Sequence, residues 1–95
     1  MRRDGRVDAN QSDIDRALRA VGASVQPLSS VGGGCPDRLV GFRGVNYLLE
    51  IKDGSKPPSK RKLTPDQVVW HGTWQGQKAV VKSVDEALQA IGATK

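Results

Sequence analysis

The stretch GCPDRLVGFRGVNYLLEIK, residues 34–52, contains the strongest structural signal in a chain of 95 residues. Residues 38–42 and 45–52 are rich in β-branched and aromatic side chains, and the intervening Arg43-Gly44 is typical of a two-residue hairpin turn. The second run is apolar on both faces until Glu50, as is usual for a central strand. The stretch therefore predicts a β-hairpin inside a sheet.

The predicted turn determines which side chains of the hairpin share a face. With a two-residue turn, Phe42 pairs with Val45. At the open end Asp37 then pairs with Glu50, with Cβ atoms roughly 4.5–5.5 Å apart. Lys52 lies two residues beyond Glu50 and so projects from the same face. A longer turn with a bulge would shift the pairing by one residue, so that Asp37 would no longer face Glu50. Glu50 and Lys52 would still project from the same face.

This convergence of two carboxylates and an amine is a candidate site for a divalent cation and phosphate chemistry. Carboxylates directly across a strand pair repel each other, and a bound cation removes that repulsion. Oxygen ligands suit Mg²⁺, which keeps waters for phosphate oxygens and lowers the pKa of a bound water. Lys52 would orient or deprotonate that water, or stabilise charge developing on the phosphate. The alternative is a surface Glu50–Lys52 pair beside a turn aspartate, because Glu-x-Lys alone is common.

The rest of the chain predicts three helices and two more strands. A helix with apolar side chains at i, i+3, i+4 and i+7 starts near Val7 or at Ser12 and ends at Gly22. The pattern then predicts a strand within residues 23–30 and, after the hairpin, a basic loop over 53–62. A helix from Thr64 to about Trp74, a strand over 78–82 and a helix from Ser83 to Gly92 follow. The two helices begin with capping boxes, at Thr64/Gln67 and Ser83/Glu86. The order α-β-β-β-α-β-α indicates an α/β fold with a mixed sheet of about four strands flanked by helices.

Composition narrows the class of protein. Fifteen lysines and arginines against ten acidic residues leave a net charge of +5, which favours a polyanionic partner, although solubility alone would also explain it. The single cysteine, Cys35, excludes an internal disulfide framework and a zinc site built from cysteine clusters. No apolar run approaches the roughly 20 residues that span a bilayer, and the polar N-terminus lacks the apolar stretch of a signal peptide. We therefore expect a cytoplasmic protein with no membrane contact and no organic cofactor.

In these residues the chain resembles the PD-(D/E)xK nuclease superfamily. Pro36-Asp37 matches the first half-motif and Glu50-Ile51-Lys52 the second. Within the superfamily the chain is most similar to small phage-type VRR-NUC (virus-type replication-repair nuclease) proteins, whose motifs run in the order GCPDRLV (34–40), LEIK (49–52), LTPDQ (63–67) and VVKS (80–83). The resemblance covers nearly the whole chain. It implies a single VRR-NUC-like domain over residues 1–95, with a flexible basic arm at residues 1–6.

The resemblance implies a restriction-endonuclease-like core that hydrolyses DNA phosphodiester bonds with Mg²⁺, or with Mn²⁺ in its place. The metal ligands would be Asp37, Glu50 and the backbone carbonyl of Ile51. Lys52 would be the catalytic amine, with Gln67 close to the site.

Many relatives add a metal-binding glutamate on the first helix, where this chain has none. The candidates here are Asp8 or Asn10 as a ligand, directly or through water, or Gln11 holding the carboxylates.

Small members of the family resemble junction-resolving enzymes that act as homodimers. A symmetric dimer would present two sites, so a four-way DNA junction is the favoured substrate. The alternatives are a nuclease for flap, single-stranded or linear DNA, and a non-catalytic DNA-binding module.

Other polar and aromatic side chains near the predicted site could have either a functional or a purely structural role. Six basic residues are candidate DNA contacts: Arg38, Lys56, Lys60, Arg61, Lys62 and Lys82. For those in the loop, the alternative is a solvated, mobile segment. Trp70 and Trp74 lie on one helical face, where packing in the core or in a dimer interface is favoured over base stacking. His71 is expected at the surface or at an interface.

Overall fold

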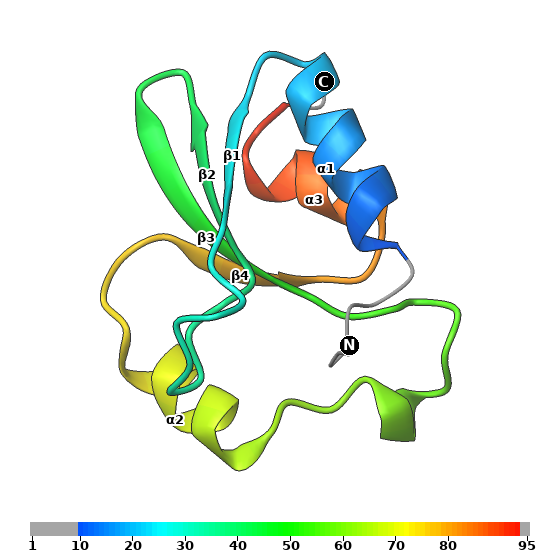
Figure 1. Ribbon diagram of the computed structural model, residues 1–95, viewed down its shortest axis with the longest axis vertical. Coiled ribbons are helices and arrows are strands. Elements are labelled where there is room, and N and C mark those ends of the chain that lie inside the picture. Colours follow the sequence, from blue (N-terminus) through cyan, green and yellow to red (C-terminus); the bar gives the residue numbers. More distant parts are fainter. Residues whose placement is uncertain (1–9, 94–95) are drawn as a thin grey trace.

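A four-stranded mixed sheet forms the centre of the computed structural model, which describes residues 10–93 (Figure 1). The strands lie side by side in chain order; the first three are antiparallel, and the fourth runs parallel to the third. Their bounds are Ser24–Pro27 for β1, Arg38–Phe42 for β2, Val45–Ile51 for β3 and Lys78–Val81 for β4. The predicted α/β fold and the order of its elements are therefore confirmed.

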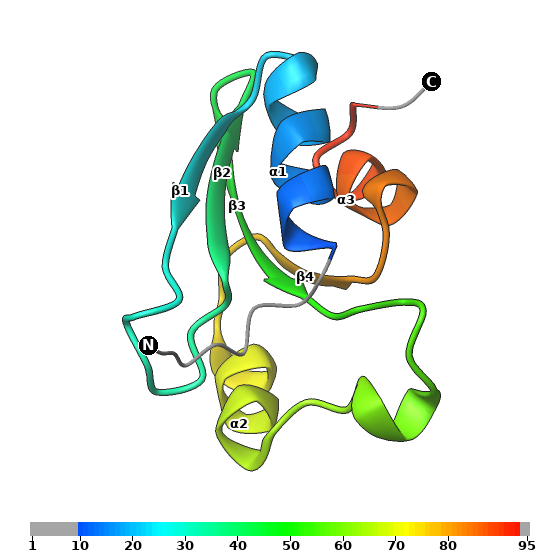
Figure 2. The ribbon, with the colours of Figure 1, turned by 45° about the vertical axis from the view of Figure 1, so that its right-hand side comes forward.

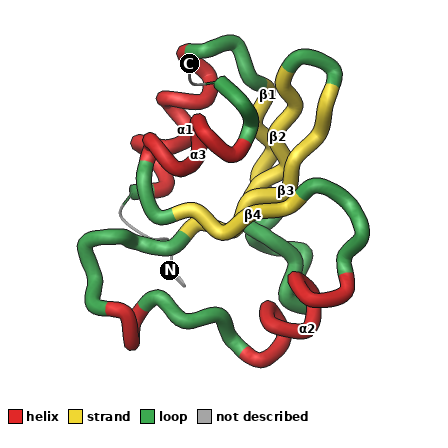
Figure 3. The backbone as a smooth tube through the Cα atoms, turned by 180° about the vertical axis from the view of Figure 1, so that it is seen from behind, coloured by secondary structure: helices red, strands yellow, loops and turns green. Residues whose placement is uncertain are grey.

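The helices lie in two places relative to the sheet. Figure 2 shows α1 (Gln11–Ala20) and α3 (Val84–Ala90) side by side against one face. The third helix, α2 (Pro65–Thr73), lies apart from them, beyond one end of the sheet (Figure 3). A short 3₁₀ turn, η1 (Pro58–Lys60), interrupts the predicted loop between β3 and α2. No helix within residues 10–93 is long and apolar enough to cross a membrane.

The hairpin of β2 and β3 has the predicted register. Phe42 pairs with Val45 next to the turn, and the ladder extends to Arg38 paired with Leu49. Both residues of the Arg43-Gly44 turn have positive φ, +53° and +82°. Two positive φ values are typical of the type I′ turn, whose twist matches that of the strands. The alternative register, shifted by a bulge, is therefore wrong.

One face of the hairpin lies in the hydrophobic core. Leu49 and Ile51 are buried against α1 and α3. Glu50 and Lys52 alternate with them along the chain, so they project from the opposite face, as predicted. The core is completed by apolar side chains from the helices, the strands and the turn after α1: Ile14, Leu18, Ala23, Val40, Phe42, Val81, Ala87 and Ile91.

Two local details differ from the prediction. β1 is shorter than predicted, because the chain turns away after Leu28, whose N–H donates to the Asp37 carbonyl at 2.8 Å. At the start of α3, Ser83 accepts a hydrogen bond from the Glu86 N–H. The Glu86 side chain, however, accepts from the Lys82 N–H at 2.9 Å, so only half of the predicted capping box forms.

The helix α2 contains no buried residue. Its predicted capping box is confirmed, because the Thr64 hydroxyl accepts from the Gln67 N–H and the Gln67 side chain accepts from the Thr64 N–H. Trp70 is half-buried and Trp74 is 44% exposed. The expectation that these tryptophans pack in the core is therefore wrong, and the dimer interface stays a prediction.

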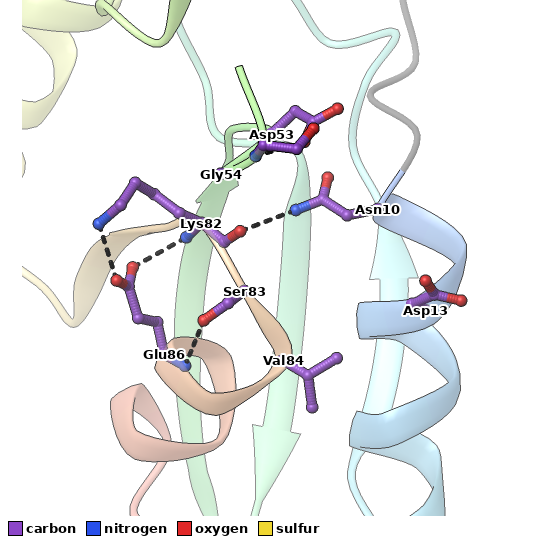
Figure 4. Close-up of a pocket in the computed structure, with 9 residues that line it drawn as sticks. Asn10, Asp13, Asp53, Gly54, Lys82, Ser83, Val84 and Glu86 are labelled. Atoms are coloured by element: carbon purple, nitrogen blue, oxygen red, sulfur yellow. Dashed lines mark hydrogen bonds and ion pairs between the residues drawn. The ribbon is translucent and has the colours of Figure 1, made fainter. Parts of the chain in front are cut away.

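Asn10 connects the start of α1 to the ends of β3 and β4. Its Nδ2 donates to the carbonyl oxygen of Lys82 at 3.0 Å (Figure 4) and to that of Lys52 at 3.1 Å. Because its amide is used in this way, Asn10 makes no side-chain cap bond to the helix. The helix begins before the predicted cap at Ser12, and the predicted start near Val7 lies outside the described residues.

The Asn10→Ala variant should lower the free energy of unfolding by about 1–3 kcal/mol, because it leaves the Lys52 carbonyl without this donor. The Lys82 carbonyl keeps a second donor, the Gly54 N–H at 3.2 Å. Urea unfolding followed by circular dichroism measures the change, with Ser12→Ala at an exposed position of the same helix as the control. A stability equal to that of the wild type would contradict this role for Asn10.

Candidate functional site

Three of the predicted side chains converge at the open end of the hairpin. Asp37, directly before β2, accepts a hydrogen bond at Oδ2 from the Ile51 N–H at 2.8 Å. Glu50 in β3 is only 2% exposed, and the Lys52 Nζ lies 3.7 Å from its Oε2. The structure therefore brings the two carboxylates and the amine together in the arrangement that the hairpin register predicts.

Gln67, in the first turn of α2, links the two charged groups of β3. Its Nε2 donates to Glu50 Oε2 at 3.0 Å, and its Oε1 accepts from Lys52 Nζ at 3.1 Å. The same Oε1 accepts from the Thr64 N–H at 2.9 Å. The helix cap and the candidate site therefore share one atom, which holds the amide of Gln67 in a single orientation.

The glycine-rich loop before Asp37 packs closely on the start of α2. Gly34 has a φ of +83°, and a Cβ added there would lie 2.6 Å from the backbone carbonyl carbon of Asp66. Both the backbone conformation and the available space therefore require glycine at this position. This contact holds the loop that carries Asp37 against the helix that carries Gln67.

The electrostatics of the site centre on Glu50. Burial and the adjacent Asp37 carboxylate raise the pKa of Glu50 to about 8, while the Lys52 ammonium acts in the opposite direction. Glu50 Oε1 is buried and has no hydrogen-bond partner among residues 10–93. A divalent cation would supply the missing partner and would offset the repulsion between the carboxylates. The carboxyl groups of Asp37 and Glu50 therefore fit a hard cation such as Mg²⁺, whereas the Ile51 carbonyl as a further ligand stays a prediction.

The additional ligands considered for the first helix stay predictions. Asp8 lies outside the described residues. Asn10 directs its amide nitrogen at backbone carbonyls, and its Oδ1 is buried without a protein partner. Gln11 accepts a hydrogen bond from Arg38 at 3.3 Å, so its carbonyl oxygen is directed at a guanidinium. In that part of the chain, no three side chains of His, Cys, Asp or Glu gather as a metal site.

Arg38 is not available for the predicted DNA contact. Its guanidinium is buried and forms two bonds with Asp15, from Nε to Oδ1 at 2.8 Å and from Nη2 to Oδ2 at 3.0 Å. It also donates to the backbone carbonyl of Asp37 at 3.0 Å. This group therefore fixes the backbone beside the site. Sequence reasoning missed the pairing because Asp15 lies 23 positions away and shares no local motif with Arg38.

The other predicted DNA contacts lie in the loop after β3 and at the end of β4. Three of them are exposed: Lys56, Lys60 and Lys62. Arg61 is half-buried. Lys82 Nζ forms an ion pair with Glu86 at 2.7 Å, in the lining of a cleft of about 460 Å³ that also includes Asn10 (Figure 4). The loop lysines are therefore accessible to a polyanion, whereas the Lys82 ammonium already has an acidic partner.

The fold, together with the acidic pair and its neighbouring lysine, is similar to that of a small α/β nuclease domain. A solved structure described as a VRR_NUC domain matches with a TM-score of 0.63 and 26% sequence identity, over 90% of this chain and 98% of that chain. The predicted resemblance to a VRR-NUC nuclease domain is thereby confirmed. No protein-family model matches the sequence, and no match is found among curated proteins.

The raised pKa of Glu50 predicts that the stability of the metal-free protein falls with increasing pH. Between the ordinary pKa of 4.5 and the folded value of about 8, the folded chain keeps a proton that the unfolded chain has released. Stability is therefore lost as the pH rises through this range. We expect the Tm in EDTA to fall between about pH 5 and about pH 8, and to fall less in Glu50→Gln. Thermal unfolding across the range measures both slopes; equal slopes would show that another group is responsible.

Proposed function

We propose that this chain is a metal-dependent endonuclease that hydrolyses the phosphodiester bonds of DNA. The observation that carries the proposal is the buried Glu50 carboxyl group beside the half-buried Asp37, with Lys52 next to it. Two adjacent carboxylates in a buried place are unfavourable in a purely structural role, whereas a cation with its phosphate substrate requires oxygen ligands. The likeness to a VRR_NUC domain over 90% of this chain supports the same activity.

Each residue of the site has a distinct part in this mechanism. Asp37, Glu50 and the Ile51 carbonyl would hold Mg²⁺, or Mn²⁺ in its place, with Asp8 as a further candidate ligand. The bound cation supplies polarisation of a phosphoryl oxygen and a water of lowered pKa. Lys52 orients or deprotonates the attacking water, or stabilises the charge that develops on the phosphate. Gln67 keeps Lys52 and Glu50 in position, since its amide is bonded to both.

The basic loop after β3 provides the DNA contacts beside the site. Lys56, Lys60 and Lys62 are exposed and follow Lys52 directly in the chain. Lysines in this position bind backbone phosphates and position the strand without reading its sequence. The net charge of +5 favours the same polyanionic partner.

We infer further that the substrate is branched DNA and that the active form is a homodimer. Two subunits related by a two-fold axis present two sites, which can cut two strands of a four-way junction. Val68 and Val69 of α2 are 55% and 65% exposed, and they offer an apolar surface to a second copy. The alternative is a nuclease that cuts flaps, single strands or linear duplex.

The Glu50→Ala and Lys52→Ala variants should each lower the cleavage rate by about 100-fold or more, with DNA binding retained, because each removes a group that acts on the reacting phosphate. Cleavage of labelled DNA in Mg²⁺ gives the rate, and a mobility-shift assay in EDTA gives the binding.

Asp85→Asn and Arg16→Ala are matched controls for these variants. They remove an exposed acidic and an exposed basic side chain on helices α3 and α1, outside the site, so both should cut at the wild-type rate. Wild-type cleavage by either site variant would contradict the mechanism. Cleavage that persists in EDTA would contradict the requirement for a metal.

A comparison of substrates tests the preference for branched DNA. We expect paired, symmetric nicks in a labelled four-way junction, and a mass of two chains by size exclusion with light scattering, because two symmetric sites act on one junction. Val69→Glu, which places a charge on the exposed apolar surface of α2, should shift the mass towards one chain. Cutting confined to flaps would favour the alternative nuclease, and no cutting with any divalent metal would favour a DNA-binding module.

A further inference from the structure

Trp74, directly after α2, is a large aromatic side chain that the fold does not bury. One face of its indole stacks on Trp70, with ring centroids 4.8 Å apart and planes inclined by 13°. Gly76 lies against the Nε1 edge of the same ring, so close that an added Cβ would lie 2.9 Å from Nε1. These contacts fix the indole, yet 44% of the residue is exposed. The uncovered face of the ring is therefore held rigidly towards solvent.

A positive charge lies beside this ring. Lys78 Nζ donates to the carbonyl oxygen of Trp74 at 2.6 Å. Lys78 pairs with Leu48 in the parallel ladder of β3 and β4. Leu48 lies two residues before Glu50, so its side chain projects from the same side of β3 as those of Glu50 and Lys52. Lys78, whose ammonium group contacts the Trp74 carbonyl, therefore projects from the face of the sheet that carries the candidate catalytic groups.

His71 lies beside the two stacked tryptophans. Its imidazole lies edge-on to Trp70, with centroids 5.2 Å apart. Burial and then the ammonium groups of Lys78 and Lys52 lower the pKa of His71, so the ring is neutral near pH 7. Lys78 and Lys52 thus place positive charge near the tryptophan pair, alongside the carboxyl groups of the site, and a phosphate would bind at these ammonium groups.

The helix α2 sets the distance from the site to the exposed ring. Gln67, which contacts Glu50 and Lys52, lies seven residues before Trp74, or about 10 Å along the helix axis. That length corresponds to about three base steps of a stacked strand, and to fewer in an extended strand. A strand with its phosphate at Lys52 would therefore bring a base about one to three nucleotides away to Trp74.

We propose that Trp74 stacks on an unpaired base of the bound strand and so selects DNA that has unpaired bases beside the bond to be cut. This inference rests on the proposed nuclease function and defines its substrate class. In a continuous duplex, both faces of each base are covered by neighbours, so an indole can stack only on a base that is unpaired or terminal. Flaps, single strands and open branch points contain such bases.

Binding of DNA that cannot be cut tests this proposal. The protein carries Glu50→Ala and is kept in EDTA, and the DNA is a flap with 2-aminopurine at one of the first three unpaired positions. Stacking on Trp74 should quench the fluorescence at one of these positions. Trp74→Ala should abolish the quenching and weaken flap binding by about 10-fold to 100-fold, with little effect on a covalently closed circular duplex, which has no unpaired and no terminal base.

Two further variants separate stacking from other effects. Trp74→Phe retains an aromatic face and should keep most of the quenching and of the preference for the flap. Val21→Ala removes an exposed apolar side chain at the other end of the molecule and should behave as the parent protein. Thermal unfolding of each variant confirms that it is folded before binding is compared.

Three results would overturn the proposal: unchanged quenching in Trp74→Ala, equal weakening of flap and duplex binding, or conversion of a dimer to single chains by this substitution. The last result would identify the ring as an interface between copies. Cleavage is measured in a separate experiment, with protein that retains Glu50 and with a divalent metal present. Retained cleavage without any effect of Trp74 on binding overturns this inference alone, whereas absence of cleavage with every divalent metal overturns the proposed function.

Discussion

The site depends on one electrostatic constraint, the burial of the Glu50 carboxyl group beside the carboxylate of Asp37. Burial and Asp37 raise the pKa of Glu50, and only Lys52 and Gln67 stabilise its charged form among the residues described. Folded domains are stable by only about 5–15 kcal/mol, so a repelling pair persists only where the surrounding structure holds it in place. Here the Ile51 N–H holds Asp37 and the α2 amide of Gln67 holds Glu50. Contacts from β3 and α2 therefore oppose the repulsion.

The hairpin can hold this pair because alternate residues of the same strand serve the core and the site. Leu49 and Ile51 anchor β3 against α1 and α3, and Glu50 between them is thereby directed away from the core. A slip of one residue would bury Glu50 in the core and would expose both apolar side chains, which is strongly unfavourable. The type I′ turn at Arg43-Gly44 and the burial of the core thus impose the same register that brings the acidic pair together.

An interaction could be predicted from the sequence where its partners are close together along the chain, and it was missed where they are far apart. The turn, the cap at Thr64 and the alternation along β3 depend on neighbouring residues, and these features were predicted correctly. Arg38 was predicted to bind DNA because it is basic and near the site, but its partner Asp15 is brought to it only by the packing of α1 on the sheet. For Trp74, only the predicted alternative of packing in the core is wrong, because a stripe of aromatic residues along a helix does not indicate whether anything covers it.

The helix α2 shows how closely the site and its surroundings depend on each other. No residue of α2 is buried, so apolar packing within this chain contributes little to its position. Its start is held instead by polar contacts, since Gln67 Oε1 accepts hydrogen bonds from both Lys52 and the capping Thr64 N–H, and by the close approach of Gly34. A helix anchored in a core would be insensitive to the charges of Glu50 and Lys52. Gln67 of this helix is bonded to both of them, so the charges of the site act directly on the helix that precedes Trp74.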